Sequence, residues 1–240
     1  MLTSGMSISV AESQDLAAIV AREGWAVTPP VVPQLELDAL IEALTPLAGT
    51  GRGGARNLLD VPLVARLAAS RAVRAIAESV LGPHCFAVRA LLFDKTPDAN
   101  WKVIWHQDLT IAVEQRAAVA GFGPWSEKEG VSHVQPPVAI LEQMLAVRVH
   151  LDDCGAENGP VRVLPGSHRV GRLSSEGVDA WKSSAEPVAC LVERGGVLAF
   201  RPLILHASSP ATVPAHRRVV HLEFAAAELP SPLEWHRRVA

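Results

Sequence analysis

The chain has 240 residues, of which 49% are hydrophobic and 20% charged, and its formal net charge is −3. This composition indicates a globular protein with a sizeable core and excludes a largely disordered chain. Lysines and arginines are scattered and show no excess, so nucleic acid is not expected as a partner.

The cysteines and the N-terminal sequence both favour a soluble cytoplasmic protein. Cys85, Cys154 and Cys190 are odd in number and far apart, which indicates reduced thiols rather than a disulfide framework. The stretch MLTSGMSISVAESQD lacks the pattern of a secretion signal, and no apolar run reaches the roughly 18 residues of a membrane span. We therefore expect no membrane association.

The part of the chain up to about residue 82 is predicted to be mostly helical. Apolar residues recur at helical spacing over 12–22, 33–47 and 62–82, and the last of these segments ends at Gly82-Pro83. A short extended piece, WAVTPPVV, separates the first two predicted helices.

A glycine-rich loop, GTGRGGARNLLDVP (49–62), precedes the third predicted helix. Its two arginines, Arg52 and Arg56, are candidates to reach a ligand. Isolated glycines mark turns more often than phosphate-binding loops, however, and the G-x-x-x-x-G-K-[ST] motif is absent. A flexible surface loop is therefore the favoured interpretation.

The character of the sequence changes at about residue 83. Short runs rich in β-branched and aromatic residues alternate with Gly, Pro, Asn and Asp up to about residue 228, which is typical of antiparallel strands. Helices followed by strands favour one domain, 1–240, in which helices pack on a double-sheet barrel or sandwich. The Gly- and Pro-rich stretch 114–143 interrupts the strands and is too long for a simple hairpin, so we expect a lid.

Two H-x-D pairs are candidates for metal binding: His106 and Asp108 in WKVIWHQDLT, and His150 and Asp152 in RVHLDDCG. Nine histidines and nine aspartates in this chain make roughly a third of one such pair expected by chance. In a strand, residues i and i+2 point the same way and can bind one ion. The pattern alone does not decide between the two pairs.

A two-histidine, one-carboxylate iron site needs a third ligand from a distant strand. His206 is the candidate, because it ends the apolar strand in GGVLAFRPLILHASSP. Eleven residues later, Arg217 and Arg218 begin another strand, where a guanidinium near the metal suits a carboxylate. Alternation sends the two arginines to opposite faces, so only one of them can face a site for an iron-bound 2-oxo acid.

Four stretches resemble the phytanoyl-CoA dioxygenase family of iron(II)/2-oxoglutarate oxygenases. They are EGWAVTPPVVPQLELDALIEAL, WHQD, LDDCGAENGPVRVLPGSHR and GGVLAFRPLILHASSPATVPAHRRVVHLEF, which together span most of residues 20–226. The resemblance implies a mostly β fold with flanking helices, in which N-terminal helices pack on a double-stranded β-helix (jelly-roll, cupin-like) core.

The resemblance also implies roles for individual residues. His106, Asp108 and His206 match the family's iron ligands. Arg217 matches the arginine that pairs with the distal carboxylate of 2-oxoglutarate, and Ser208 matches a hydroxyl that often joins it.

The second H-x-D pair lies in a stretch similar to a strand–turn–strand signature of the family. Asp152 and Asp153 are accordingly expected to cap a turn with Asn158-Gly159 at its tip. On the strand before that turn, Arg148 and His150 share one face and either line the pocket or face solvent.

Trp125 lies in the predicted lid. It either stacks over the substrate or cosubstrate or only anchors the lid.

The implied activity is hydroxylation of an unactivated carbon of a small organic substrate, with Fe²⁺ as cofactor and with conversion of 2-oxoglutarate and O₂ to succinate and CO₂. Asp108 favours this over halogenation, because related halogenases have a small residue in its place. A cupin-like lyase or isomerase that does not use 2-oxoglutarate and a non-catalytic ligand-binding β-helix protein remain as alternatives.

A monomer and a homodimer are both compatible with the sequence. The acidic residues of the predicted lid argue against a coenzyme A thioester as substrate.

Overall fold

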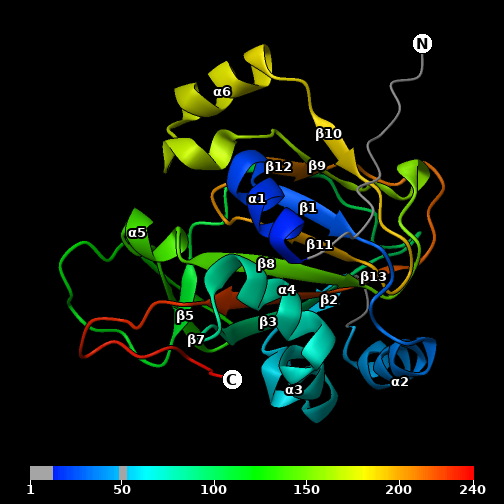
Figure 1. The fold of residues 1–240 in the computed structure, drawn as a ribbon, viewed down its shortest axis with the longest axis horizontal. Helices are drawn as coiled ribbons and strands as arrows, with labels where there is room; N and C mark the ends of the chain where they lie inside the picture. Colours follow the sequence, from blue (N-terminus) through cyan, green and yellow to red (C-terminus); the bar gives the residue numbers. More distant parts are fainter. Residues whose placement is uncertain (1–12, 49–52) are drawn as a thin grey trace.

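The computed structural model describes residues 13–48 and 53–240, and two antiparallel sheets pack together in it beside a third, smaller sheet (Figure 1). This arrangement confirms the predicted mostly β fold with a double-stranded β-helix core and flanking helices. The first sheet has the order β1-β11-β8-β13-β3-β2, the second β10-β9-β12-β4 and the third β5-β7-β6. The strands are β1 (Trp25–Thr28), β2 (Gly54–Ala55), β3 (Phe86–Lys95), β4 (Val103–His106), β5 (Ile111–Val113), β6 (Trp125–Lys128), β7 (Val131–Val134), β8 (Met144–His150), β9 (Val161–Val163), β10 (Val188–Cys190), β11 (Val197–Phe200), β12 (His206–Ser208) and β13 (Arg217–Ala225).

The helical N-terminal part is confirmed with one correction, because the single helix predicted over 62–82 is two helices. The Ser70 hydroxyl accepts a hydrogen bond from the backbone N–H of Val73 at 3.4 Å and caps the second of them. Apolar periodicity continues through this position, so it did not reveal the break. The helices are α1 (Ser13–Glu23), α2 (Gln34–Leu44), α3 (Pro62–Ala69), α4 (Arg71–Leu81), α5 (Val138–Leu141) and α6 (Ser175–Ser184). None of the helices in the described ranges is long and apolar enough to cross a membrane.

The two faces of the six-stranded sheet have different surroundings. Helices α1 to α4 cover the outer face, where they bury apolar side chains of β8 and β13 such as Val147 and Leu222 (Figure 1). Because side chains alternate along a strand, Arg148 and His221, which are paired across β8 and β13, point to the inner face. Apolar side chains of the second sheet, Val163 among them, cover part of that inner face. Polar side chains of the six-stranded sheet therefore lie between the two sheets.

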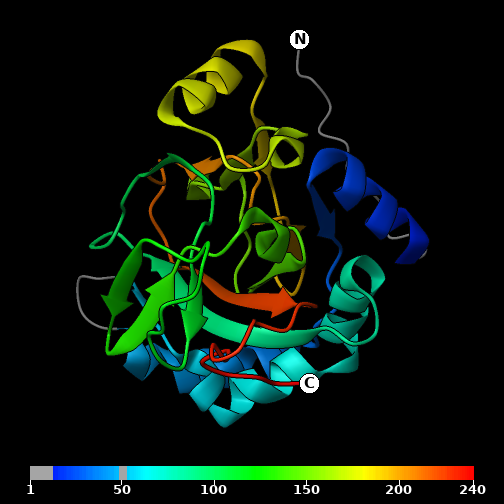
Figure 2. The ribbon, with the colours of Figure 1, turned by 90° about the vertical axis from the view of Figure 1, so that its left-hand side faces the viewer.

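The predicted lid, 114–143, contains strands β6 and β7 and helix α5. Strand β7 pairs with β6 on one side and with β5 on the other in the third sheet, which Figure 2 shows on the opposite side of the molecule from α1. Val134 and Leu141 are buried against Phe86 and Trp235. This packing fixes the hairpin on the core, and its action as a lid stays a prediction.

The turn after β8 differs in detail from the prediction. Asn158-Gly159 does lie at the turn, where the Asn158 side-chain oxygen accepts from the backbone N–H of Gly155 at 3.2 Å. The carboxylates of Asp152 and Asp153 bond elsewhere: Asp152 accepts from the backbone N–H of Arg218 at 2.8 Å, and Asp153 accepts from a backbone N–H at 2.7 Å. Asp152 thus attaches the start of β13 to the end of β8.

Replacing Asp152 with Ala is expected to lower the free energy of unfolding by roughly 1–3 kcal/mol, because the partly buried N–H and guanidinium of Arg218 lose their acceptor. Chemical denaturation measures this change. The control is Asp179→Ala, which removes an exposed ion pair with Lys182 on α6 and should cost much less. Equal losses in the two variants would contradict the structural role of Asp152.

Candidate metal centre

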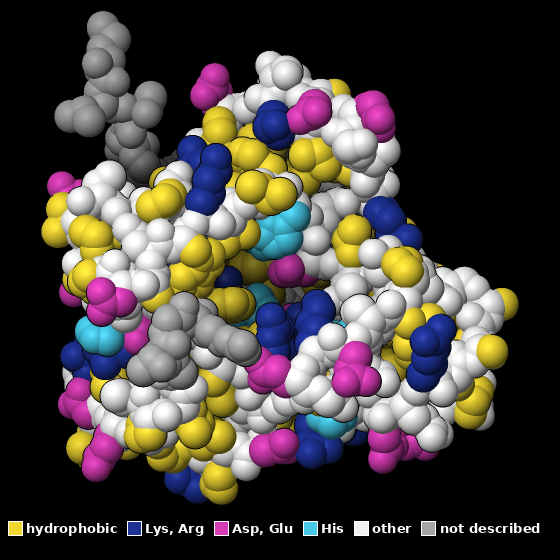
Figure 3. Space-filling model, turned by 180° about the vertical axis from the view of Figure 1, so that it is seen from behind, with side chains coloured by type: hydrophobic (Ala, Val, Ile, Leu, Met, Phe, Trp, Pro, Cys, Tyr) yellow, Lys and Arg dark blue, Asp and Glu magenta, His cyan; other side chains and the backbone are white. Residues whose placement is uncertain are grey.

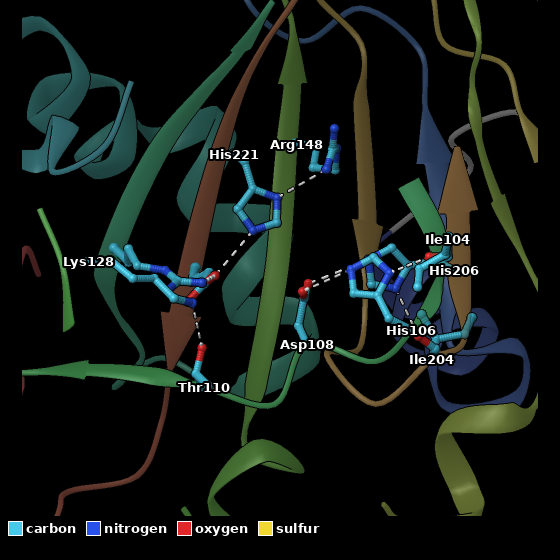
Figure 4. A network of polar contacts seen from close by, with 11 residues as sticks. Ile104, His106, Asp108, Thr110, Lys128, Arg148, Ile204, His206 and His221 are labelled. Atoms are coloured by element: carbon cyan, nitrogen blue, oxygen red, sulfur yellow. Dashed lines mark hydrogen bonds and ion pairs between the residues drawn. The ribbon is translucent and has the colours of Figure 1, made fainter. Parts of the chain in front are cut away.

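The structure brings His106, Asp108 and His206 together from distant parts of the chain (Figure 4). Strand β12 runs antiparallel to β4 and pairs His206 directly with His106. The possible ligand atoms of the three residues all lie within 4.8 Å of one another, and each histidine Nε2 is 3.7 Å from an oxygen of Asp108. Two atoms that each bind one ion at about 2.1 Å are at most about 4.2 Å apart, so these histidine–carboxylate distances fit a shared ion.

Both histidine rings are oriented by the same kind of backbone contact. Nδ1 of His106 lies 2.8 Å from the carbonyl oxygen of Ile104, and Nδ1 of His206 lies 3.0 Å from that of Ile204. A carbonyl oxygen only accepts, so each Nδ1 carries the proton and each Nε2 keeps its lone pair on the side of Asp108. This is the tautomer that binding of a metal ion through Nε2 requires.

The charges of the three side chains depend on one another. Burial lowers the pKa of His206 to about 4, although Asp108 opposes this. Burial also acts to lower the pKa of His106, but the hydrogen bond and the charge of Asp108 outweigh it and raise that pKa. Burial would raise the pKa of Asp108, yet the neighbouring histidines hold it well below its usual range. A neutral His206 beside an ionised Asp108 is the state in which both bind a cation.

Gln107, to which the sequence assigned no role, fixes the turn that carries Asp108. Its amide nitrogen donates to the carbonyl oxygens of Gly171 at 2.8 Å and Leu203 at 2.7 Å, and its amide oxygen accepts from the N–H of Leu173 at 2.9 Å. The turn is therefore attached both to the loop before α6 and to the segment that leads to β12.

A cavity of about 470 Å³ opens at the cluster, and its volume suits small molecules. Figure 3 shows a hollow on this face in which histidine, acidic and basic side chains gather. The lining includes the three candidate ligands together with Ser208, Arg148 and Arg217. The predicted site residues of β4, β8, β12 and β13 thus share one cavity.

Arg217, and not Arg218, belongs to this cavity. Arg217 is buried and donates to the carbonyl oxygen of Gly159, and the Ser208 hydroxyl donates to the same oxygen at 2.9 Å. Arg218 points the other way and forms an ion pair with Asp152 at 2.6 Å.

Lys95 is a buried charged residue beside Ser208 and Arg217 to which the sequence analysis assigned no role. Its ammonium group donates to the hydroxyl of Ser208 at 2.7 Å. The sequence did offer an indication of its importance: Lys95 is a charged residue at the end of the apolar run FAVRALLFDK, and His206 was recognised from the same kind of position.

Gly159 permits the close approach of these groups. Its φ is +63°, and a Cβ atom there would lie 2.4 Å from the carbonyl oxygen of Ser209 and 3.0 Å from Nζ of Lys95. Glycine adopts this conformation at no steric cost, and only glycine leaves this space free because it has no Cβ atom.

Two of the remaining candidate residues, His150 and Trp125, lie outside the cavity, and a third, Arg56, lies in it. His150 is buried away from the lining, and neither of its ring nitrogens has a hydrogen-bond partner in the part of the chain that the structure describes. Trp125 packs in the third sheet's core, with the guanidinium of Arg116 at 5.5 Å from its ring, and does not reach the cavity. Arg56 lines the cavity although a surface loop was favoured, and Arg52 lies outside the described residues.

A double-stranded β-helix with a His–Asp–His cluster in its cavity defines a class of metal-binding folds. Within that class, the model of the phytanoyl-CoA dioxygenase family (PhyH) matches residues 21–219, so the chain belongs to this family. This confirms the resemblance found in the sequence. No curated protein sequence matches the chain.

Solved structures share the fold at low sequence identity. EctD from S. alaskensis with bound Fe is 20% identical with a TM-score of 0.70, and the match covers 96% of this chain and 83% of that one. The non-heme alpha ketoglutarate dependent carbocyclase SnoK from nogalamycin biosynthesis is 16% identical with a TM-score of 0.68, over 94% of this chain and 87% of that one. The epimerase SnoN from the same biosynthesis is 20% identical with a TM-score of 0.67, over 90% and 81%.

Replacing Asp108 with Ala is expected to lower the affinity for iron(II) by more than the roughly 10–100-fold that loss of an outer hydrogen bond costs, because it removes a direct ligand. Anaerobic equilibrium dialysis with metal analysis measures the affinity. Asp153→Ala, which removes an exposed carboxylate outside the cluster, should leave it unchanged. Unaltered iron binding in Asp108→Ala would show that the cluster is not the metal site.

Proposed function

We propose that the protein is a non-haem iron(II) enzyme that uses 2-oxoglutarate and O₂ to hydroxylate an unactivated carbon of a small organic substrate. The observation that carries the proposal is that the His–Asp–His cluster shares its cavity with two buried cations, Arg148 and Arg217. A third buried cation, Lys95, lies behind the lining and donates to the hydroxyl of Ser208. Iron(II) bound at the cluster would couple the oxidative decarboxylation of 2-oxoglutarate, to succinate and CO₂, to oxidation of the substrate.

The buried cations favour an anionic cosubstrate. Burial, and then the charge of Arg217, lowers the pKa of Lys95 to about 8 and that of Arg148 to about 10. None of the ion pairs among the described residues involves any of these three cations. Like charges buried together are unfavourable, and a carboxylate bound between them would relieve the repulsion. The planar fork of Arg217 suits a carboxylate.

The spacing along β12 relates this anion site to the metal. His206 and Ser208 occupy alternate positions of the strand and therefore face the same side, about 7 Å apart. A five-carbon dicarboxylic acid can span this distance. One of its carboxylates would then lie near Ser208 and Arg217, while its 2-oxo acid end reaches the cluster.

The proposal also names the type of reaction, which is hydroxylation. The structural neighbours include a carbocyclase and an epimerase, so this fold serves more than one type of reaction. Hydroxylation is supported because Asp108 supplies the carboxylate that halogenases lack. A cupin-like lyase or isomerase would need the three ligands without the buried cations, which makes it the weaker alternative.

The surrounding chain would exclude water from the reacting atoms. Lys128 and Gln135, both from the segment 114–143, contribute to the cavity lining. Arg56 approaches Glu129, in the turn of the β6–β7 hairpin, at 3.8 Å and thereby connects the glycine-rich loop to this segment. We propose that 114–143 acts as the lid of a single catalytic domain, 1–240.

Arg217→Ala is expected to raise the half-saturating concentration of 2-oxoglutarate by about ten- to a hundredfold, because a charged hydrogen-bond partner of the carboxylate is lost. Succinate formation against cosubstrate concentration measures it. Arg218→Ala is the matched control and should leave this concentration unchanged, since Arg218 bonds to Asp152. If only Arg218→Ala has the effect, the assignment of Arg217 is wrong.

Binding of 2-oxoglutarate should also weaken in mildly alkaline solution. The ammonium of Lys95 is present below its lowered pKa of about 8 and is lost as the pH rises through it. The dissociation constant, measured anaerobically, should therefore rise several-fold between about pH 7 and pH 9. A Lys95→Met variant should bind more weakly at pH 7 and lack this rise. The same pH dependence in both proteins would contradict the role of Lys95.

A further inference from the structure

The cavity has a second cationic end that the binding of 2-oxoglutarate does not use. Arg89 on β3, Lys128 on β6 and Arg56 after β2 line it. The whole lining contains five lysine and arginine side chains but a single carboxylate, Asp108, in a protein whose net charge is −3. Such a concentration of positive charge in a cavity attracts anions.

The pairing of β3 with β13 shows that the two cationic ends are far apart. Arg217 is opposite Lys95 at one end of the pair, and Glu223 is opposite Arg89 near the other. Arg89 and Lys95 are six positions apart on β3, which corresponds to about 20 Å along the strand. A five-carbon cosubstrate held by Arg217 cannot reach Arg89.

The positive charge of the second end is only partly compensated. Arg89 forms an ion pair with Glu223, which also lies 3.3 Å from Nε2 of His221. Nε and Nη1 of Arg89 are nevertheless buried and have no hydrogen-bond partner among the described residues. Two of the three nitrogens of a buried guanidinium thus lack an acceptor.

Lys128 is the second uncompensated group. Its ammonium lies 3.4 Å from the hydroxyl of Thr110, two residues after Asp108, and it forms no ion pair with a carboxylate of residues 13–48 or 53–240 (Figure 4). Burial lowers its pKa, and the charges of Arg89 and Arg56 act in the same direction. The cations of this end are therefore close enough to repel one another, and they adjoin the metal cluster.

We propose that this second cationic end binds an anionic group of the substrate, a carboxylate or a phosphate. The guanidinium of Arg89 and the ammonium of Lys128 would share its oxygens, and the rest of the molecule would extend toward Asp108. Because the same cavity of about 470 Å³ must also hold the cosubstrate, the substrate is small. That the anion belongs to a substrate rests on the proposed function, whereas the anion site itself does not.

Ligand-observed NMR with acetate, acetamide and inorganic phosphate as probes tests the anion site in protein saturated with 2-oxoglutarate, which occupies the Arg217 end. Acetate or phosphate should bind and neutral acetamide should not, and the stronger of the two anions indicates the group. Lys128→Met should weaken anion binding at least about tenfold, and Lys128→Arg should retain it. Lys182→Met, which removes a distant exposed cation on α6, is the control.

Lys128 is the residue to replace because its side chain is only half-buried, whereas loss of Arg89 would leave Glu223 buried without its cation. Equal binding of acetamide and acetate, unchanged anion binding in Lys128→Met, or no anion binding at all would overturn the inference. Anion binding that depends on Lys128 in a protein that binds neither iron nor 2-oxoglutarate would refute the proposed function and leave the anion site standing. Binding of iron and 2-oxoglutarate without binding of acetate or phosphate would refute the anion site and leave the proposed function standing.

Discussion

The antiparallel pairing of β12 with β4 is the contact on which the candidate site depends. It sets His206 directly opposite His106, and the hydrogen bonds of Gln107 hold the following turn so that Asp108 faces both rings. The backbone N–H of Asp108 donates to the carbonyl oxygen of Pro202 at 2.9 Å, which attaches the same turn to the segment before β12. The segment of His106 and Asp108 and the segment of His206 therefore have to be paired before the three side chains can surround one ion.

The site also depends on the six-stranded sheet, whose outer face packs on the helices and whose inner face carries charged side chains of the cavity. Outward side chains of β8 and β13 pack on the helices and form the largest apolar core, while inward side chains of the same strands include Arg148, Arg217 and His221. Charges buried between two sheets cost folding free energy unless they are paired. The apolar packing on the other face offsets this cost, so the cavity can keep cations ready for anionic ligands. Substrate and cosubstrate are accordingly both expected to contribute to the stability of the loaded protein.

Much of the fold and of the site could be predicted from the sequence, and the parts that could not share a physical reason. Strand alternation and turn residues indicated the β core. The order of the H-x-D pair, the later histidine and the arginine eleven residues on indicated the candidate metal ligands and the arginine proposed to bind the cosubstrate. Lys95 and Arg89 escaped notice because their importance comes from the pairing of β3 with β13, which local patterns do not reveal. Arg148 and His150 share a strand face, yet only Arg148 lines the cavity. Alternation along a strand predicts which face of the sheet a side chain lies on, but not whether that side chain reaches the cavity.

If one cavity binds iron(II) at the His–Asp–His cluster and 2-oxoglutarate beside it, the two bound together should give the protein a visible absorption. Anaerobic addition of iron(II) and then 2-oxoglutarate to the purified protein, followed by the visible absorption spectrum, is the decisive experiment. We predict a metal-to-ligand charge-transfer band that appears only when both are present. Stoichiometric iron binding with no such band at saturating 2-oxoglutarate would contradict the account and favour a metalloenzyme that does not use a 2-oxo acid.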